Sequence, residues 1–263
     1  MINERRVHAA VTACVIAMTL LLVAVVALNA NPGNPVIPRE ARPPFSNVNL
    51  AAPFSVMGFL AAAAGLVVAV LVIAWAVAAG QRLVARAMLT IAGAGVALYA
   101  TALLGFSLHS RGSELAPGVE KYFCEIDCHL AYTVTDVKTT KTLAPPGAEP
   151  GSGRGVFYVV TLRTRFDPNT IAPWRGNAPL QPNPRKVEVI DADGKRYLPR
   201  SVDGTDLRTV IHPGESYTTR LVFDLPENVR EPRLLVTSAN GFPEPLLIGD
   251  ENSPLHKKVS FRL

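Results

Sequence analysis

Three long runs of apolar residues occupy most of the first 110 positions. They cover about residues 9–30, 54–80 and 87–108, and none of them contains a charged side chain. A hydrocarbon core about 30 Å thick requires roughly 20 residues of helix. A soluble helix of that length would show a polar face, and these runs have none. The pattern therefore predicts a membrane anchor over residues 1–110, built from three transmembrane helices.

Positive charges beside the apolar runs predict the orientation of this anchor. Arg5 and Arg6 precede the first run, and Arg82 and Arg86 lie in the short turn between the second and third. The positive-inside rule places both groups in the cytoplasm. The N-terminus is then cytoplasmic, and the loop after the first run and everything after the third lie outside. A signal peptide cleaved after residues 28–30 is an alternative for the first run and gives the same topology. The length of that run favours an uncleaved helix.

After a linker over residues 111–121, the apolar pattern changes to the period of two that is typical of β-strands. The segments HLAYTVTDVK, GVFYVVTLRTRF and SYTTRLVFDLP alternate in this way, and Asp193-Gly194 is a tight-turn signal between two further strands. Three more short strands are expected in PRLLVTS, EPLLIG and KKVSFRL. Seven or eight short strands predict that residues 122–263 form an antiparallel β-sandwich.

Part of this second half is similar to a known family. The similarity is carried, in chain order, by Val156–Phe166, by Val187–Tyr197 with its Asp-Gly turn, and by His212–Pro226. In the last segment Pro213-Gly214-Glu215 precedes a strand that ends in Leu-Pro. The region over about residues 120–260 resembles the immunoglobulin-like domains of unknown function that follow lipoprotein signals or membrane helices in bacterial surface proteins. The resemblance implies an immunoglobulin-like sandwich outside the cytoplasm, and it implies no activity.

Charge and motifs narrow the function further. The chain has 26 Lys and Arg against 21 Asp and Glu, and most of the excess belongs to the membrane anchor. A nucleic-acid partner would require that charge on the water-exposed domain, so none is expected. The apolar runs lack the intramembrane charges of a transporter or pump. With no nucleophile elbow or triad signature, we expect a non-catalytic binding module of the cell envelope, in contact with membrane lipid and an unidentified envelope protein.

The segment KYFCEIDCHLAY carries the one chemical signal of the chain. Cys124, Cys128 and His129 are three metal-type ligands close together, and two thiolates with an imidazole suit copper or zinc. The C-x-x-x-C spacing resembles the cysteine loop of the binuclear copper centre in cytochrome oxidase subunit II and that of copper-delivering assembly proteins. Tyr132 stands where that copper centre has a His, and the outer domain has no Met. A mononuclear site would need a fourth ligand, for which the candidates are His109, His212 and His256.

A disulfide between Cys124 and Cys128 is the alternative, because thiols outside the cytosol tend to oxidise. A bridge needs Cα atoms about 4.4–6.8 Å apart, whereas four extended steps span about 13 Å, so the chain would have to turn between them. Inert buried thiols are a third alternative, and the sequence leaves the choice open. Separately, Trp174-Arg175 lies in a Pro- and Asn-rich loop. It predicts a contact point for a partner, unless Trp174 folds back onto its own domain.

Overall fold

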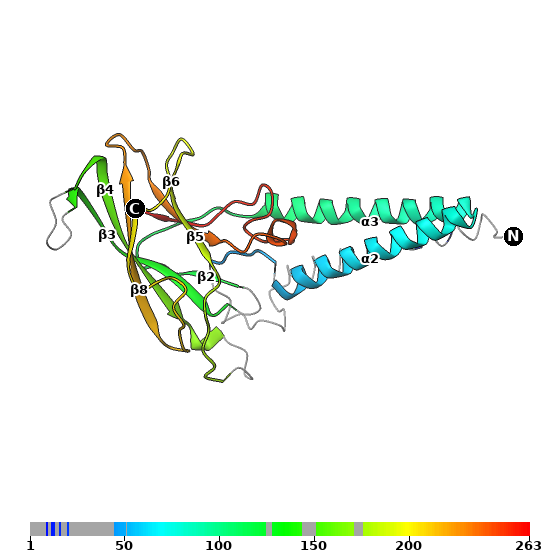
Figure 1. Ribbon diagram of the computed structural model, residues 1–263, viewed down its shortest axis with the longest axis horizontal. Coiled ribbons are helices and arrows are strands. Elements are labelled where there is room, and N and C mark those ends of the chain that lie inside the picture. The colour runs from blue at the N-terminus through cyan, green and yellow to red at the C-terminus, as the bar shows by residue number, and fades with distance from the viewer. Residues whose placement is uncertain are drawn as a thin grey trace.

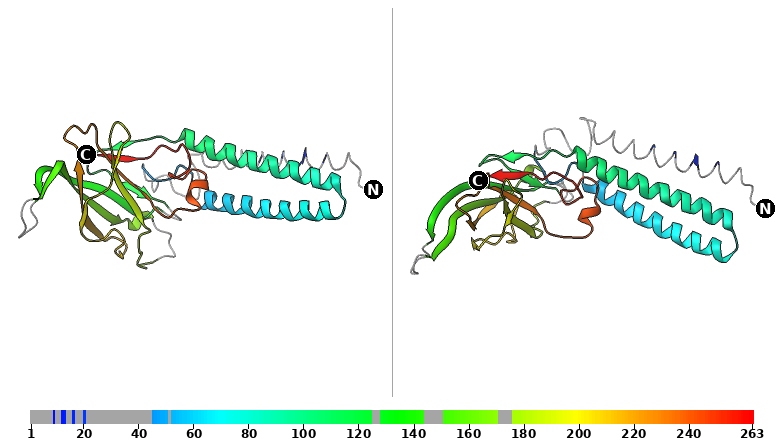
Figure 2. Two further views of the ribbon diagram at one scale, coloured as in Figure 1. Left: turned by 45° about the horizontal axis from the view of Figure 1, so that its top comes forward. Right: turned by 90° about the horizontal axis from the view of Figure 1, so that it is seen from above.

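A helical hairpin extends from one end of a β-domain built from two sheets (Figures 1 and 2). The computed structural model describes, besides isolated positions between residues 9 and 20, the ranges 45–50, 52–124, 128–143, 151–170 and 176–263, with the backbone alone at 143, 151–154 and 170. The expected first span, residues 9–30, and the Trp174-Arg175 contact point therefore lie almost wholly or wholly outside the described residues.

The hairpin consists of α2 (Ala52–Ala78) and α3 (Arg82–His109). Both helices are long and apolar enough to cross a membrane, and in their most apolar windows only 6% and 11% of the residues are buried. In the part of the chain that the structure describes, helices long enough to span a membrane are thus found at two of the three expected positions. One detail differs from the expectation, because α3 already begins at Arg82. Arg82 and Arg86 therefore lie in the first two turns of α3 and not in the turn that connects the helices.

The described residues contain ten strands, which form the two sheets of the β-domain. In sheet order, the first consists of β1 (Glu114–Leu115), β10 (Ser260–Arg262), β9 (Arg233–Ser238), β5 (Arg185–Ile190) and β6 (Arg196–Tyr197). The second consists of β2 (Lys121–Phe123), β3 (Leu130–Leu143), β4 (Gly151–Phe166), β8 (Ser216–Leu225) and β7 (Ser201–Gly204). All neighbours are antiparallel except β1 and β10, which run parallel.

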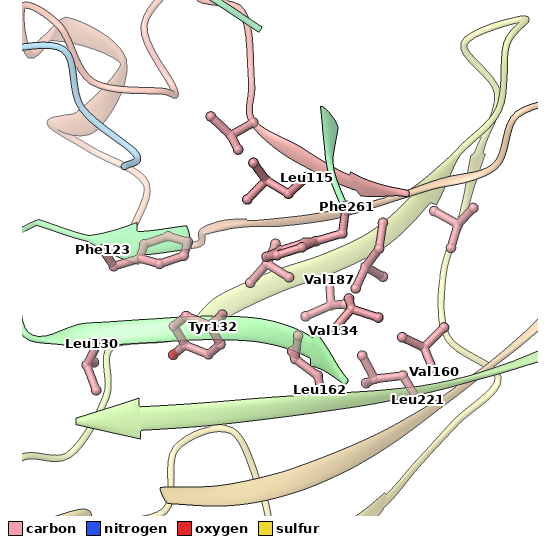
Figure 3. Packing of buried hydrophobic residues seen from close by; sticks show 14 of the residues in the cluster. Leu115, Phe123, Leu130, Tyr132, Val134, Val160, Leu162, Val187, Leu221 and Phe261 are labelled. Atoms are coloured by element: carbon pink, nitrogen blue, oxygen red, sulfur yellow. The ribbon is translucent and has the colours of Figure 1, made fainter. Parts of the chain in front are cut away.

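The period-two pattern explains the core between these sheets (Figure 3). Leu162 on β4 and Leu221 on β8 are fully buried, and they face Leu234 and Phe261 from the other sheet within one cluster. Each fully buried side chain of this kind contributes roughly 1.5–3 kcal/mol relative to an exposed one. The Asp-Gly turn is confirmed, since Gly194 has a φ of 80° between β5 and β6.

Two segments differ from the expected strand boundaries. EPLLIG is not a strand, because Glu244–Leu246 forms a short 3-10 helix, η3. Pro243 and Pro245 flank its first residue, and a proline cannot donate the hydrogen bond that a sheet requires. β1 begins at Glu114, inside the expected linker, and pairs with β10. A second short 3-10 helix, η2, follows β4 at Pro168–Thr170.

The segment that precedes α2 is part of the β-domain. Ser46 forms a bridge with Tyr122, and Val48 forms one with Asp250. The backbone N–H of Tyr122 donates to the carbonyl of Phe45 at 2.9 Å, and the N–H of Asn47 donates to Tyr122 at 3.1 Å. The chain leaves this domain through α2 and returns to it through α3. Both ends of the hairpin are therefore attached to the same domain.

Candidate functional site

Cys124 and Cys128 are joined by a disulfide between the end of β2 and the start of β3. Their Cα atoms lie 4.1 Å apart, so the chain makes the turn that the disulfide alternative requires. Cys124 is buried, and its backbone N–H donates to Oδ1 of Asn47 at 2.7 Å. The two acids of the predicted ligand segment, Glu125 and Asp127, lie outside the described residues.

The histidines expected as metal ligands occupy separate places. His129 is buried with its ring centroid 4.9 Å from that of Phe166. His109 ends α3, His212 contacts Glu215 at 3.3 Å, and His256 lies in the loop before β10. In the described ranges, no three His, Cys, Asp or Glu side chains are grouped to hold a metal ion. Sulfurs bonded to each other are not thiolates, so copper or zinc binding stays a prediction for the reduced chain.

A network of charged side chains lies next to the disulfide. Arg165 on β4 donates to both carboxylate oxygens of Glu120, each at 2.7 Å, and to Asp167 at 3.1 Å. The hydroxyl of Tyr122 lies 2.9 Å from Oε2 of Glu120 and 2.8 Å from Oδ2 of Asp167. This hydroxyl has one proton and can donate to only one carboxylate at a time. The bidentate pair fixes β2 against β4 across the intervening strand.

The electrostatics of this network favour a structural role. The hydrogen bond from Arg165 lowers the pKa of Glu120. Burial, together with the two neighbouring carboxylates, raises the pKa of Tyr122. Burial alone would raise the pKa of Asp167, but hydrogen bonds from the Asn169 N–H, Tyr122 and Arg165 lower it. Tyr122 therefore stays protonated and the two acids stay ionised, so none of the three is prepared to act as a general acid or base near neutral pH.

A buried ion pair holds the end of the β-domain that faces the helices. Lys121 is 0% exposed and Glu251 is 1% exposed, with 2.7 Å between Nζ and Oε2. Nζ also donates to the carbonyl of Val236 at 2.6 Å, and the N–H of Ser238 donates to Glu251 Oε1 at 3.1 Å. Burial lowers the pKa of Lys121, and Glu251 opposes that shift. The pair connects β2 of one sheet to β9 of the other.

Two more carboxylates lie near this ion pair. Glu244 on η3 accepts hydrogen bonds from Ser238 Oγ at 2.5 Å and from Asn240 and Asn252, both at 2.9 Å. Burial, followed by repulsion from Glu244 and Glu251, raises the pKa of Asp250 to about 7. A shallow pocket of about 410 Å³ opens beside Glu244, and its lining includes Lys186 and Asn252. The Glu244 carboxylate already accepts hydrogen bonds from three donors, which tie η3 to the end of β9 and to the turn at Asn252.

Lys121 and Glu251 were not among the predicted site residues, although one signal in the sequence indicates the lysine. Residues 121 and 123 point to the same face of β2, because successive side chains of a strand alternate. Phe123 is buried in the core, so the side chain at position 121 must also point inward. A buried lysine requires a partner. No pattern in the sequence identifies that partner as Glu251, since the two residues are far apart in the chain.

Comparison with known proteins does not identify a family. No protein-family model matches the chain, and no curated protein matches it significantly. A conserved hypothetical protein from Bacillus anthracis has 13% identity and a TM-score of 0.31, and the match covers 41% of this chain and 82% of that one. The secreted protein MPT63 from Mycobacterium tuberculosis has 14% identity and a TM-score of 0.32, with 58% and 100% covered. Both TM-scores are too low to support an argument about function.

Proposed function

We propose that the chain is a non-catalytic binding module of the cell envelope, anchored in the cell membrane and presenting an immunoglobulin-like β-sandwich outside the cytoplasm. The attachment of both hairpin ends to one domain carries this proposal. If α2 and α3 cross the bilayer, the segment 45–50 and the domain after α3 share a compartment. Arg82 and Arg86 at the turn of the hairpin favour the cytoplasm for that turn. The disulfide fits an oxidising compartment on the other side.

The described polar clusters support a binding role over a catalytic one. Glu120 and Arg165 form a bidentate pair, and Lys121 and Glu251 are buried against each other. The pKa of Tyr122 is raised, which makes its hydroxyl a weaker acid. These groups stabilise the sandwich, and none of them combines an activated nucleophile with a base. Such a scaffold suits a domain whose task is to hold a surface in place.

We propose the outer half of β3 as the binding surface. The β3–β4 hairpin extends away from the membrane helices (Figures 1 and 2). On β3, β2 pairs with Leu130–Tyr132 alone, and the carbonyl of Val134 accepts a hydrogen bond from the N–H of Gly118 at 2.9 Å. Among the described strands, residues 135–143 therefore have β4 alone as a neighbour. An exposed edge of this kind can accept an extended strand of a partner. Lys138 and Lys141 are exposed along it and form surface ion pairs with Asp136 and Glu227. Exposed pairs contribute at most about 1 kcal/mol, so an acidic segment of an envelope protein can exchange with these partners.

Reporter fusions test the proposed location. We expect alkaline phosphatase fused after Leu263 to be active, and a fluorescent protein that folds only in the cytosol to be dark at that position. The same fluorescent protein inserted at Gly80, in the turn of the hairpin, should be bright. The opposite pattern would exclude an extracytoplasmic sandwich. It would also remove the expectation of a stable disulfide.

Site-specific photocrosslinking in whole cells tests the proposed surface. A photoreactive residue at Thr139 on β3 should give one discrete adduct with an envelope protein. The matched control is Thr218, an exposed threonine on β8, an interior strand of the same sheet. Replacing Lys138 and Lys141 with Glu should reduce the adduct at Thr139. Equal adducts at both threonines, or no effect of the charge reversal, would refute binding at the β3 edge.

A further inference from the structure

The loop Gly241–Ile248, which we call the collar loop, has an apolar outer side and a fixed inner side. Phe242 is 77% exposed and Leu246 is 41% exposed. On the inner side Glu244 is buried and hydrogen-bonded, and Ile248 is buried. Two large apolar side chains are thus held outward on a turn whose inner side is hydrogen-bonded to the domain. They suit a surface that contacts lipid.

The collar loop lies against both membrane helices. The ring of Phe242 contacts that of Phe59 on α2 edge to face, with 5.9 Å between centroids. The hydroxyl of Tyr99 on α3 donates to the carbonyl of Leu246 at 2.7 Å. Ile248 belongs to a buried cluster that includes residues of α3. These contacts fix the position of the loop along the hairpin. Figure 1 shows the C-terminal third of the chain meeting α2 and α3 at the ends nearest the sheets.

The rise per residue of an α-helix gives the depth at which the loop would lie in a membrane. At 1.5 Å per residue, Phe59 lies about 28 Å from the end of α2 at Ala78. Tyr99 lies about 26 Å from the start of α3 at Arg82. The hydrocarbon core of a bilayer is about 30 Å thick. With Arg82 at the inner edge of that core, Phe59 and Tyr99 lie just inside its outer edge.

We infer that the collar loop inserts Phe242 and Leu246 into the outer leaflet and binds phospholipid directly. This inference rests on the proposed crossing of the bilayer by the hairpin. Apolar side chains that enter the boundary between headgroups and acyl chains add buried area to the anchor. Tyr99 lies at the same depth, and its hydroxyl donates to the loop. Tyrosines are common at this depth, where the membrane meets water. The sandwich is thereby held at a fixed tilt, which presents the β3 edge at a constant height above the membrane.

Fluorescence quenching by brominated lipids tests the insertion. The full chain, with Trp75→Phe and Trp174→Phe, receives Phe242→Trp as its only tryptophan and is reconstituted into phosphatidylethanolamine and phosphatidylglycerol vesicles. Part of the lipid is phosphatidylcholine brominated either near the headgroup or near the bilayer centre. We expect blue-shifted emission that is quenched more strongly by the shallow bromines. The matched control is Val202→Trp, on the strand at the opposite edge of the sheet from β2, which should be quenched by neither.

A second measurement distinguishes failure of the loop insertion from failure of the proposed membrane anchor. In the chain with Trp174→Phe alone, Trp75 on α2 reports whether the hairpin lies in the bilayer. Quenching of Trp75 without quenching of the Phe242→Trp variant would overturn the insertion and leave the anchor intact. Absence of quenching at both positions would overturn the anchor and the insertion together. A Leu246→Trp variant repeats the measurement at the second apolar position and must agree with Phe242→Trp.

Discussion

Removal of the buried cation at Lys121 is the sharpest test of how the β-domain is stabilised. The substitution Lys121→Met keeps the length of the side chain and deletes its charge. Glu251 then remains at 1% exposure with no cation beside it. It keeps the N–H of Ser238 as a donor, but the carbonyl of Val236 loses its hydrogen bond from Nζ.

The expected loss of stability follows from this geometry. Breaking one side of a buried ion pair costs about 3–5 kcal/mol, because the remaining charge is uncompensated. The converse change, Glu251→Gln, should cost only about 1–3 kcal/mol. Burial lowers the pKa of Lys121, so this lysine can give up its proton when its partner is removed. Replacing both, as Lys121→Met with Glu251→Leu, should recover most of the loss, since well-packed apolar residues often replace a buried pair at no cost.

Thermal unfolding of the full chain in detergent, followed by the circular dichroism of the β-sheet, measures these effects. A loss of 3–5 kcal/mol should lower Tm by roughly 6–20 °C. The matched control is Lys141→Met, whose ion pair with Glu227 is exposed and should contribute about 1 kcal/mol at most. A Lys121→Met chain as stable as this control would refute the buried pair. A double variant no more stable than Lys121→Met would refute uncompensated charge as the cause.

Three further predictions use the same unfolding assay. Replacing Cys124 and Cys128 with Ser should lower the free energy of unfolding by about 2 kcal/mol, the chain-entropy value for a short closed loop. Separately, elemental analysis of the reduced wild-type chain decides whether its thiols hold copper or zinc. With its pKa raised to about 7, Asp250 keeps its proton in the folded chain while the unfolded chain releases it near pH 4. Its contribution to stability therefore falls as pH rises from about 4 to 7, and Asp250→Asn should raise Tm near pH 8 but not near pH 4. Gly155→Ala should lower Tm sharply, because the added Cβ would lie 1.9 Å from the carbonyl oxygen of Leu225, whereas Gly176→Ala would meet no neighbouring atom and strain only the local backbone.

The parts of the fold that the sequence predicted are those in which local periodicity decides the structure. The apolar runs gave α2 and α3 within a few residues of their ends, because a membrane-length helix needs no tertiary partner to be recognised. β3, β4 and β8 followed from strict alternation, and β5 and β6 from the turn at Gly194. η3 was mistaken for a strand because its apolar residues form a run too short to carry a period.

The contacts of the candidate site depend on the tertiary fold and could not be predicted from local sequence patterns. The disulfide between Cys124 and Cys128 was predicted as one of three alternatives, and the choice depended on a turn that spacing alone cannot show. Glu120 and Arg165 are far apart in sequence, and their pairing arises only from the register of β2, β3 and β4. Long-range polar pairs of this kind have no local signature.

The join between the helical hairpin and the β-domain links the proposed anchor to the proposed binding surface. Asn47 lies before α2, yet its backbone and side chain bond to Tyr122 and Cys124 beyond α3. The N–H of Asn49 donates to the carbonyl of Gly249, the residue that follows the collar loop. If the hairpin lies in the bilayer, these hydrogen bonds couple its position to β2, the disulfide and the collar loop. Because β2 pairs with the start of β3, the same connection reaches the strand whose outer edge we propose as the partner site. The proposed anchor would then set the direction in which that edge points, in addition to its location.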